Sequence, residues 1–291
     1  MEPLDAVADR QATLSQTADA LKKKVDRARR GVLLLSVLGA AAAGIAAALS
    51  EEGPLRHFLT IVGTACLFVA SALIAALLGA EERQRPVRFR AGSETLKREA
   101  FLFATGAGDY GGADRNERLL AALARVDEEL GELIGHEVER KDQGRCPRTP
   151  LDRETYCEQR VKGQIQFYRQ RAGGYSRSAA RLHVVAWLFS LAAGAITALS
   201  GLIGPTVFDL AAVTGILTTV AAAFMSHIQA NKYDELVISY RSAARALERL
   251  QAAIGKADTA ASIADRAEPI IAEETGSWRA MFLQDAAPVS P

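Results

Sequence analysis

Four uninterrupted apolar stretches alternate along the chain with long segments in which apolar and charged residues are mixed. The apolar stretches cover residues 31–49, 58–80, 184–204 and 208–228. Each approaches the roughly 20 apolar residues that a membrane-spanning helix requires, and none carries a charged residue in its middle. The pattern therefore predicts four membrane-spanning helices.

The charges that flank these stretches predict their orientation. Lys and Arg are concentrated in residues 22–30, 82–90 and 161–183, whereas the short connections SEEGPLRH (50–57) and Gly204-Pro205 are poor in them. Basic residues accumulate on the cytoplasmic side of spanning helices. We therefore expect a multi-pass protein of the bacterial inner membrane with both termini in the cytoplasm. About thirty hydrophilic residues precede the first span, which favours an anchor over a cleaved signal peptide.

The mixed segments carry apolar residues at alternating steps of three and four. Such a seam runs from Val161 to Leu182, another from Val237 to Leu247 and a third from Leu119 to Leu133. This spacing buries one stripe of a helix in a bundle or a short coiled coil. No proline or turn cluster separates the third and fourth spans from their cytoplasmic extensions, so each extension is predicted to continue its span without a break.

A shift of 151 residues aligns the chain with itself without a gap. Gly53-Pro54 then falls on Gly204-Pro205, and R-x5-L-x-R follows the second span of each copy. Because each copy has two spans, the copies are parallel repeats. The predicted fold is an all-α integral membrane protein of two such repeats, each a transmembrane hairpin extended by long cytoplasmic helices that form a bundle. The first repeat covers residues 1–142, the linker 143–152 and the second repeat 153–291.

The segment GAGDYG, residues 106–111, has the letter pattern of a dinucleotide-binding loop. That motif requires a preceding buried strand, whereas Leu96, Ala100 and Phe103 mark a helix here. We therefore interpret the glycines as a connection between two helices. Ser93 is expected to cap the helix before it and Asp114 the helix after it.

The residues RAGSETLKREAFLFATGAGDYGG (90–112) and AEPIIAEETGSW (267–278) resemble the SLATT-domain family. Within that family the chain is similar to longer bacterial proteins catalogued as a domain of unknown function. The resemblance implies a membrane effector that forms a pore or disrupts the membrane in bacterial defence or nucleotide-linked stress signalling. It brings no catalytic residues and no cofactor. Because no ligand-sensing domain is recognisable, the trigger is left open between a cytoplasmic signalling partner and a nucleotide.

Small and hydroxyl residues form stripes on three of the spans. The stripes comprise Thr60, Thr64 and Ser71 in the second span, Ser190, Gly194 and Thr197 in the third, and Thr214 and Thr218 in the fourth. Small residues usually mark helix packing, and hydroxyls bond their own helical carbonyls. The second interpretation is the lining of a pore.

The helices that leave the second and fourth spans carry equivalent basic and apolar residues. These are Arg90, Leu96 and Arg98 in the first copy and Arg241, Leu247 and Arg249 in the second. One hypothesis is that the arginines bond carboxylates or helix C-termini of the neighbouring repeat and couple cytoplasmic events to the spans. The alternative is contact with anionic lipid headgroups.

Composition and residue spacing give no support to nucleic-acid binding, a metal site or catalysis. The net charge of +1 gives no support to nucleic acid as a partner. Cys146 and Cys157 match no usual zinc spacing, and no catalytic constellation is present, so we expect neither a metal site nor an enzyme. Four spans enclose little space, which predicts a homo-oligomer in the lipid bilayer. A weakly selective housekeeping channel and a non-conducting membrane scaffold are the alternatives to the effector.

Overall fold

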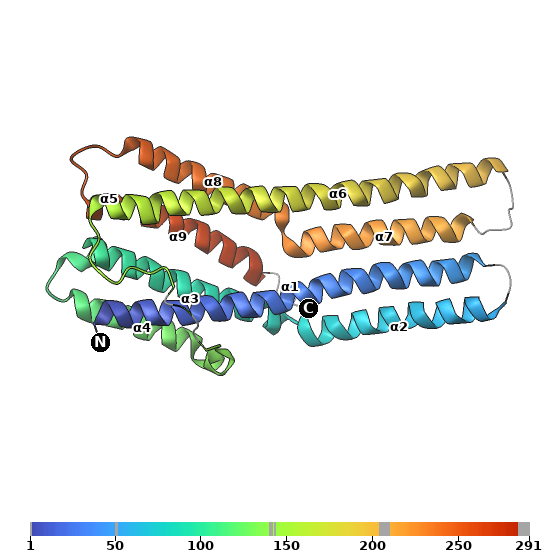
Figure 1. Ribbon diagram of the computed structural model, residues 1–291, viewed down its shortest axis with the longest axis horizontal. Coiled ribbons are helices and arrows are strands. Elements are labelled where there is room, and N and C mark those ends of the chain that lie inside the picture. The colour runs from blue at the N-terminus through green and yellow to red at the C-terminus, as the bar shows by residue number, and fades with distance from the viewer. Residues whose placement is uncertain (1, 50–51, 140–141, 143, 204–209, 285–291) are drawn as a thin grey trace. The chain divides into compact units, whose positions relative to one another are not determined.

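The computed structural model describes residues 2–49, 52–139, 142, 144–203 and 210–284, and within these ranges the regular structure is helical throughout. Figure 1 shows the elements in order. They are α1 (Pro3–Ala48), α2 (Pro54–Leu77), α3 (Ala80–Thr105), a 3₁₀ turn (Gly108–Gly111), α4 (Arg115–Leu130), a second 3₁₀ segment (Gly131–His136), α5 (Arg153–Tyr156), a π-helical segment (Cys157–Lys162), α6 (Gly163–Ile203), α7 (Leu210–Asn231), α8 (Tyr233–Ala253) and α9 (Ala260–Gln284). The all-α prediction is confirmed for this part of the chain.

The helices form two compact units that each take segments from both halves of the sequence. We call Lys24–Gly79 with Gly174–Glu235 the apolar unit. The polar unit consists of Met1–Lys23, Ala80–Gly173 and Leu236–Pro291. The predicted division into repeats at 1–142 and 153–291 is a statement about sequence order and stays a prediction.

The apolar unit contains four helices that are long and apolar enough to cross a membrane. They are α2, α7 and the corresponding parts of α1 and α6, and they coincide with the four predicted stretches. Figure 1 shows α2 alongside α1 and α7 alongside α6. Pro54 occupies the first turn of α2, where its missing N–H leaves no intrahelical hydrogen bond unmade. The equivalent turn at Gly204-Pro205 lies outside the described residues.

The third and fourth spans were predicted to continue into their cytoplasmic extensions without a break. This prediction is confirmed for α6 and is wrong for α7, which ends at Asn231 before α8 begins at Tyr233. Helix α6 runs without interruption from Gly163 to Ile203. After α7, Lys232 adopts a left-handed backbone with a φ of 50°. The Asn231 side-chain amide donates to the carbonyl of His227 at 2.7 Å and so satisfies an acceptor at the end of α7. The prediction was wrong because a left-handed residue can end a helix without proline or glycine.

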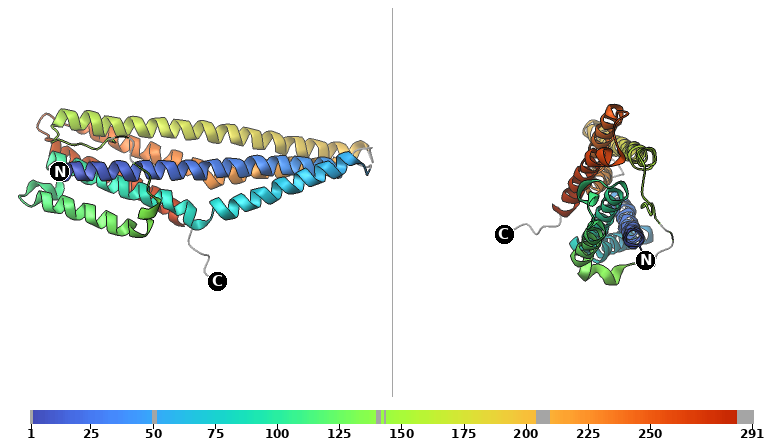
Figure 2. Two further views of the ribbon diagram at one scale, coloured as in Figure 1. Left: turned by 60° about the horizontal axis from the view of Figure 1, so that its bottom comes forward. Right: turned by 90° about the vertical axis from the view of Figure 1, so that its left-hand side faces the viewer.

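In the polar unit, α3 packs against α4 and α9. Figure 2 shows α4 running alongside α3. The predicted seams supply the buried positions, with Leu119, Val126, Val161, Tyr168 and Leu247 at most 2% exposed. Their spacing therefore located the core-facing side of each helix correctly.

The glycine-rich segment connects two helices, as predicted. Helix α3 precedes it, and Gly106 and Gly108 have φ values of 70° and 55°, which side chains other than glycine rarely adopt. Asp114 is the N-cap residue of α4, although its carboxylate accepts from Arg118 and not from the backbone. The capping role predicted for Ser93 is wrong, because α3 begins at Ala80 and Ser93 is buried within it.

Candidate functional site

The hydroxyl side chains of the predicted stripes bond mostly within their own helices. Thr60, Ser190, Thr197, Thr214 and Thr218 each donate to the carbonyl four residues earlier. Helices α6 and α7 meet where the hydroxyls of Thr197 and Thr214 lie 3.3 Å apart. This is the pattern expected of packing, because each hydroxyl is satisfied without water.

Most stripe residues nevertheless face outward from the single chain. Exposed members lie on all three helices, namely Thr60, Thr64, Ser71, Ser190, Gly194, Thr197 and Thr218. Ser190 also lines an open groove of about 500 Å³ with Trp187 and Met225. The structure therefore brings Thr197 and Thr214 together.

Glycines allow the helices of the apolar unit to approach closely. A Cβ atom at Gly63 of α2 would lie 2.9 Å from the backbone nitrogen of Ala43 in α1. A Cβ atom at Gly39 would lie 2.9 Å from Cγ of Leu67. Gly44 lies against Ile216 of α7 with no room for a side chain. Such small-residue contacts replace the hydrophobic effect as the basis of helix association in lipid. No spacing in the sequence distinguishes these three glycines from the others in the apolar stretches.

The outer surface of the apolar unit is dominated by large apolar side chains. Ile61, Phe68 and Leu202 are 67%, 73% and 85% exposed, respectively. Exposure of many large apolar side chains is unfavourable in water and is typical of a surface that contacts lipid or protein.

The predicted coupling residues have different surroundings in the two halves. The guanidinium of Arg90 lies 2.8 Å from the Glu94 carboxylate on its own helix and 3.9 Å from Asp19 on α1. Both carboxylates belong to the first half of the sequence, and the predicted ion pair with the neighbouring repeat stays a hypothesis. Arg98 lies 4.0 Å from Glu99, whereas Arg241 and Arg249 are exposed on α8. Leu96 and Leu247 are fully buried core residues.

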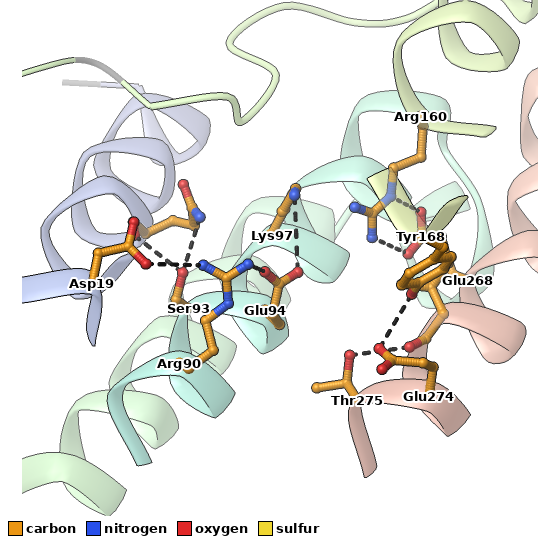
Figure 3. A network of polar contacts seen from close by, with 12 residues as sticks. Asp19, Arg90, Ser93, Glu94, Lys97, Arg160, Tyr168, Glu268, Glu274 and Thr275 are labelled. Carbon is orange, nitrogen blue, oxygen red and sulfur yellow. Dashed lines mark hydrogen bonds and ion pairs between the residues drawn. The ribbon is translucent and has the colours of Figure 1, made fainter. Parts of the chain in front are cut away.

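A buried ion pair that residue spacing did not predict lies within the polar unit. Arg160 donates to both oxygens of the Glu268 carboxylate, at 2.8 and 2.7 Å, and both side chains are at most 2% exposed (Figure 3). The Tyr156 hydroxyl donates to Glu268 at 3.0 Å, and the guanidinium lies 4.5 Å from the centre of the Phe101 ring. Two parallel bonds from the planar guanidinium fix the orientation of both groups.

The π-helical segment explains how Arg160 reaches this position. A π turn adds one residue to a helical turn and shifts the buried stripe by one position. Arg160 and Val161 are consequently both buried within the segment Cys157–Lys162. The sequence signal available was weak: an arginine immediately before a seam residue.

Electrostatics within the polar unit hold Arg160 in its charged form. Burial alone lowers the pKa of Arg160, but the charge and hydrogen bonds of Glu268 outweigh burial and raise it. Burial raises the pKa of the Tyr156 hydroxyl, and the negative charge of Glu268 raises it further. A charged guanidinium beside a neutral phenol is therefore the stable arrangement.

A second group of charges lies on α3. Burial raises the pKa of Glu94, yet Lys97 and Arg90 outweigh burial and lower it. Glu94 therefore stays ionised between two cations. Burial lowers the pKa of Lys97 and raises that of the Cys146 thiol to about 12, so this cysteine is not a thiolate at neutral pH.

The helix α1 joins α3 and the following elements through polar contacts of its own. The Gln11 amide donates to the Ser93 hydroxyl at 3.0 Å, and both residues are buried. Arg10 contacts the carboxylates of Asp127 and Glu137, both at 2.6 Å. In each half of the sequence, an arginine in or just before the long helix, Arg10 or Arg160, thus pairs with a carboxylate on α4 or α9.

The arrangement has the character of a polar interior and not of a reaction centre. Among the residues that the structure describes, no group of three or more His, Cys, Asp and Glu side chains could hold a metal ion. The carboxylate of Glu274 on α9 is partly buried, and burial raises its pKa to about 7.

Comparison with known proteins assigns a family to both halves of the chain. Residues 156–278 match the SMODS and SLOG-associating 2TM effector domain 1, the SLATT domain. Residues 12–118 match a protein family of unknown function. No curated protein and no solved structure matches the chain. The first match includes Arg160, Glu268 and Glu274, and the second includes the 90–112 segment. The second half of the chain therefore matches a SLATT domain, and the first half matches a domain of unknown function.

Proposed function

We propose that the protein is a membrane effector whose apolar unit permeabilises the bacterial inner membrane as an oligomer under the control of the polar unit. The match of residues 156–278 to a two-transmembrane effector domain carries this proposal. The outward-facing apolar side chains of α1, α2, α6 and α7 support it, because such a surface is stable in lipid.

The architecture we propose is a pair of parallel repeats. Shifted by 151 residues, α6 with its preceding segment corresponds to α1, α7 to α2, α8 to α3 and α9 to α4. In this arrangement the polar unit and both termini lie in the cytoplasm. The trigger is then a cytoplasmic signalling partner or a nucleotide that acts on the polar unit.

Reporter fusions test the orientation. A fusion at Glu52, just before α2, should be extracytoplasmic, and a fusion at Gly112, between α3 and α4, should be cytoplasmic. A cytoplasmic signal at Glu52 would contradict both the orientation and the repeat architecture.

Ion flux tests the activity. The purified full-length protein in liposomes should release a trapped ion, and its expression should collapse the membrane potential of the host cell. The variant Gly44→Leu should abolish both effects, because Ile216 of α7 leaves no space for a side chain there. Gly215→Leu is the matched control, since nothing lies within 4 Å of that position. Selective, reversible conductance without harm to cells would favour a housekeeping channel, and no flux would favour a scaffold.

A further inference from the structure

Two carboxylates on α9 have opposite surroundings: Glu268 is fully buried, whereas Glu274 is partly buried. Both oxygens of Glu268 accept hydrogen bonds from Arg160. Oε2 of Glu274 accepts a hydrogen bond from the Tyr168 hydroxyl at 3.3 Å (Figure 3). The other carboxylate oxygen, Oε1, is buried and has no hydrogen-bond partner among the described residues. A charged carboxylate in this position is poorly compensated.

The charged groups that face Glu274 are already matched to other partners. From α3, Glu94 adds negative charge, and the guanidinium of Arg90 is shared between Glu94 and Asp19 of α1. From α6 comes Tyr168, whose ring stacks on Tyr240 of α8 with centroids 5.5 Å apart. The Ser239 hydroxyl of α8 is a further neutral partner of Glu274. No cation is therefore dedicated to this carboxylate in the described part of the polar unit.

From this arrangement, and resting on the proposed effector function, we propose that Glu274 is a proton-operated contact that sets how firmly α9 docks on α6 and α3. The protonated carboxyl is neutral and fits its site beside Tyr168. Loss of the proton places a second negative charge near Glu94 and loosens α9. Helix α6 continues from the polar unit into the apolar unit. A change in the contacts of α6 at Tyr168 can therefore pass along this helix to the apolar unit.

The pH range follows from the same surroundings. Burial, and then the charge of Glu94, raise the pKa of Glu274 from 4.5 to about 7, while Tyr168, Arg90 and Ser239 oppose the shift. A raised pKa in the folded state means that the folded state binds the proton more tightly than the unfolded state does. The contribution of the Glu274 proton to the docking of α9 is therefore complete below about pH 4.5 and is lost as the pH rises through about 7.

Hydrogen exchange of α9 in the full-length protein tests the proposal independently of ion flux. Between pH 6 and pH 8, after correction for intrinsic rates, the open fraction of α9 should rise about tenfold, as linkage with these two pKa values requires. Fluorescence of Trp278, one helical turn beyond Glu274, should follow the same transition in a Trp187→Phe background.

Matched variants identify the titrating group. Glu274→Gln mimics the neutral form, so α9 should stay docked at both pH values. Glu273→Gln removes the exposed neighbouring charge and should keep the wild-type transition. Tyr168→Phe removes the donor that favours the ionised form, so the midpoint should move to higher pH.

The outcomes separate this inference from the proposed function. A wild-type α9 that shows no change between pH 6 and pH 8, or a transition that persists in Glu274→Gln, would overturn the Glu274 contact. A clear α9 transition in a protein that conducts no ions at any pH would support the contact and contradict the effector function. If both hold, Glu274→Gln should remove the pH dependence of ion flux between pH 6 and pH 8.

Discussion

At the scale of single residues, the polar unit contains an arginine and a glutamate that are removed from water together. Desolvation of two charges opposes folding, and the bidentate geometry of Arg160 and Glu268 only offsets it. The Tyr156 hydroxyl donates a further hydrogen bond to the Glu268 carboxylate, and the Phe101 ring contacts the Arg160 guanidinium. Such an arrangement tolerates loss of both charges far better than loss of one.

Replacement of one partner should therefore be severe. Glu268→Ala leaves Arg160 buried without an anion, and we expect it to destabilise the polar unit by about 3–5 kcal/mol. Thermal unfolding of the full-length protein in detergent, with hydrogen exchange resolving α9, measures the loss. The double variant Arg160→Met with Glu268→Leu should recover most of the stability.

A neighbouring ion pair provides the control for this prediction. Arg266 lies 2.8 Å from Asp258 on the surface, with its side chain 40% exposed. Arg266→Ala should lower stability by less than about 1 kcal/mol, because water screens exposed pairs. Equal effects of Glu268→Ala and Arg266→Ala would show that the buried pair has no special role.

Sequence reasoning identified buried apolar residues and missed buried polar ones, for a physical reason. Val161, Tyr168 and Leu247 follow a helical period that depends only on neighbours along the chain. Arg160 and Glu268 are 108 residues apart, and their contact exists only once α9 has packed against α5 and α3. Ser93 shows the same limit: a favourable cap by residue type became a buried partner of Gln11.

At the scale of the helices, the break between α7 and α8 depends on a lysine in a left-handed conformation. This conformation is unfavourable for a residue with a Cβ atom by roughly 1 kcal/mol. Lys232→Gly should therefore stabilise the junction relative to Lys232→Ala by about that amount, because both variants remove the same side-chain contacts. Thermal unfolding of the two variants measures the difference. A more stable Lys232→Ala would indicate that the helix runs on through residue 232.

The α1–α2 hairpin depends on the contact between Gly63 and the backbone of α1. Gly63→Leu cannot be accommodated by rotation of a side chain, because the nearest atom is the main-chain nitrogen of Ala43. We expect a loss of about 1–3 kcal/mol, which is typical of overpacking. Gly194→Leu, at a position with nothing within 4 Å, is the control for added bulk. Equal unfolding temperatures for the two variants would argue against close packing at Gly63.

The extent of the helices followed from the sequence better than their ends did. Charge-free apolar runs of span length located the apolar parts of α1, α2, α6 and α7. The start of α2 at Pro54 was also predictable, because proline favours the first helical turn. The end of α7 was not, since lysine is a good helix former and no local signal marks Lys232.

At the scale of the whole molecule, the central question is what faces the hydroxyl stripe of α2. Thr64 and Ser71 are exposed on the single chain, as are the apolar side chains on other parts of the same helix. A stripe that only faced lipid would gain nothing from hydroxyl groups. A stripe that faced other copies across a water-filled path would hydrate when the path opens. An oligomer in which α2 lines such a path is one form of the effector proposal.

Thiol accessibility distinguishes these two environments. In a background in which Cys66, Cys146 and Cys157 are replaced by serine, Thr64→Cys and Ser71→Cys should react with a water-soluble thiol reagent in the membrane, and the reaction should block ion flux. Val69→Cys is the control, because Val69 lies near the middle of α2 on a different side of the helix and is 45% exposed. It should react at least about tenfold more slowly, since a thiol in hydrocarbon is not a thiolate. Native mass spectrometry in mild detergent should show more than one copy per particle. Monomers alone, together with equal reactivity at residues 64 and 69, would exclude a path lined by α2.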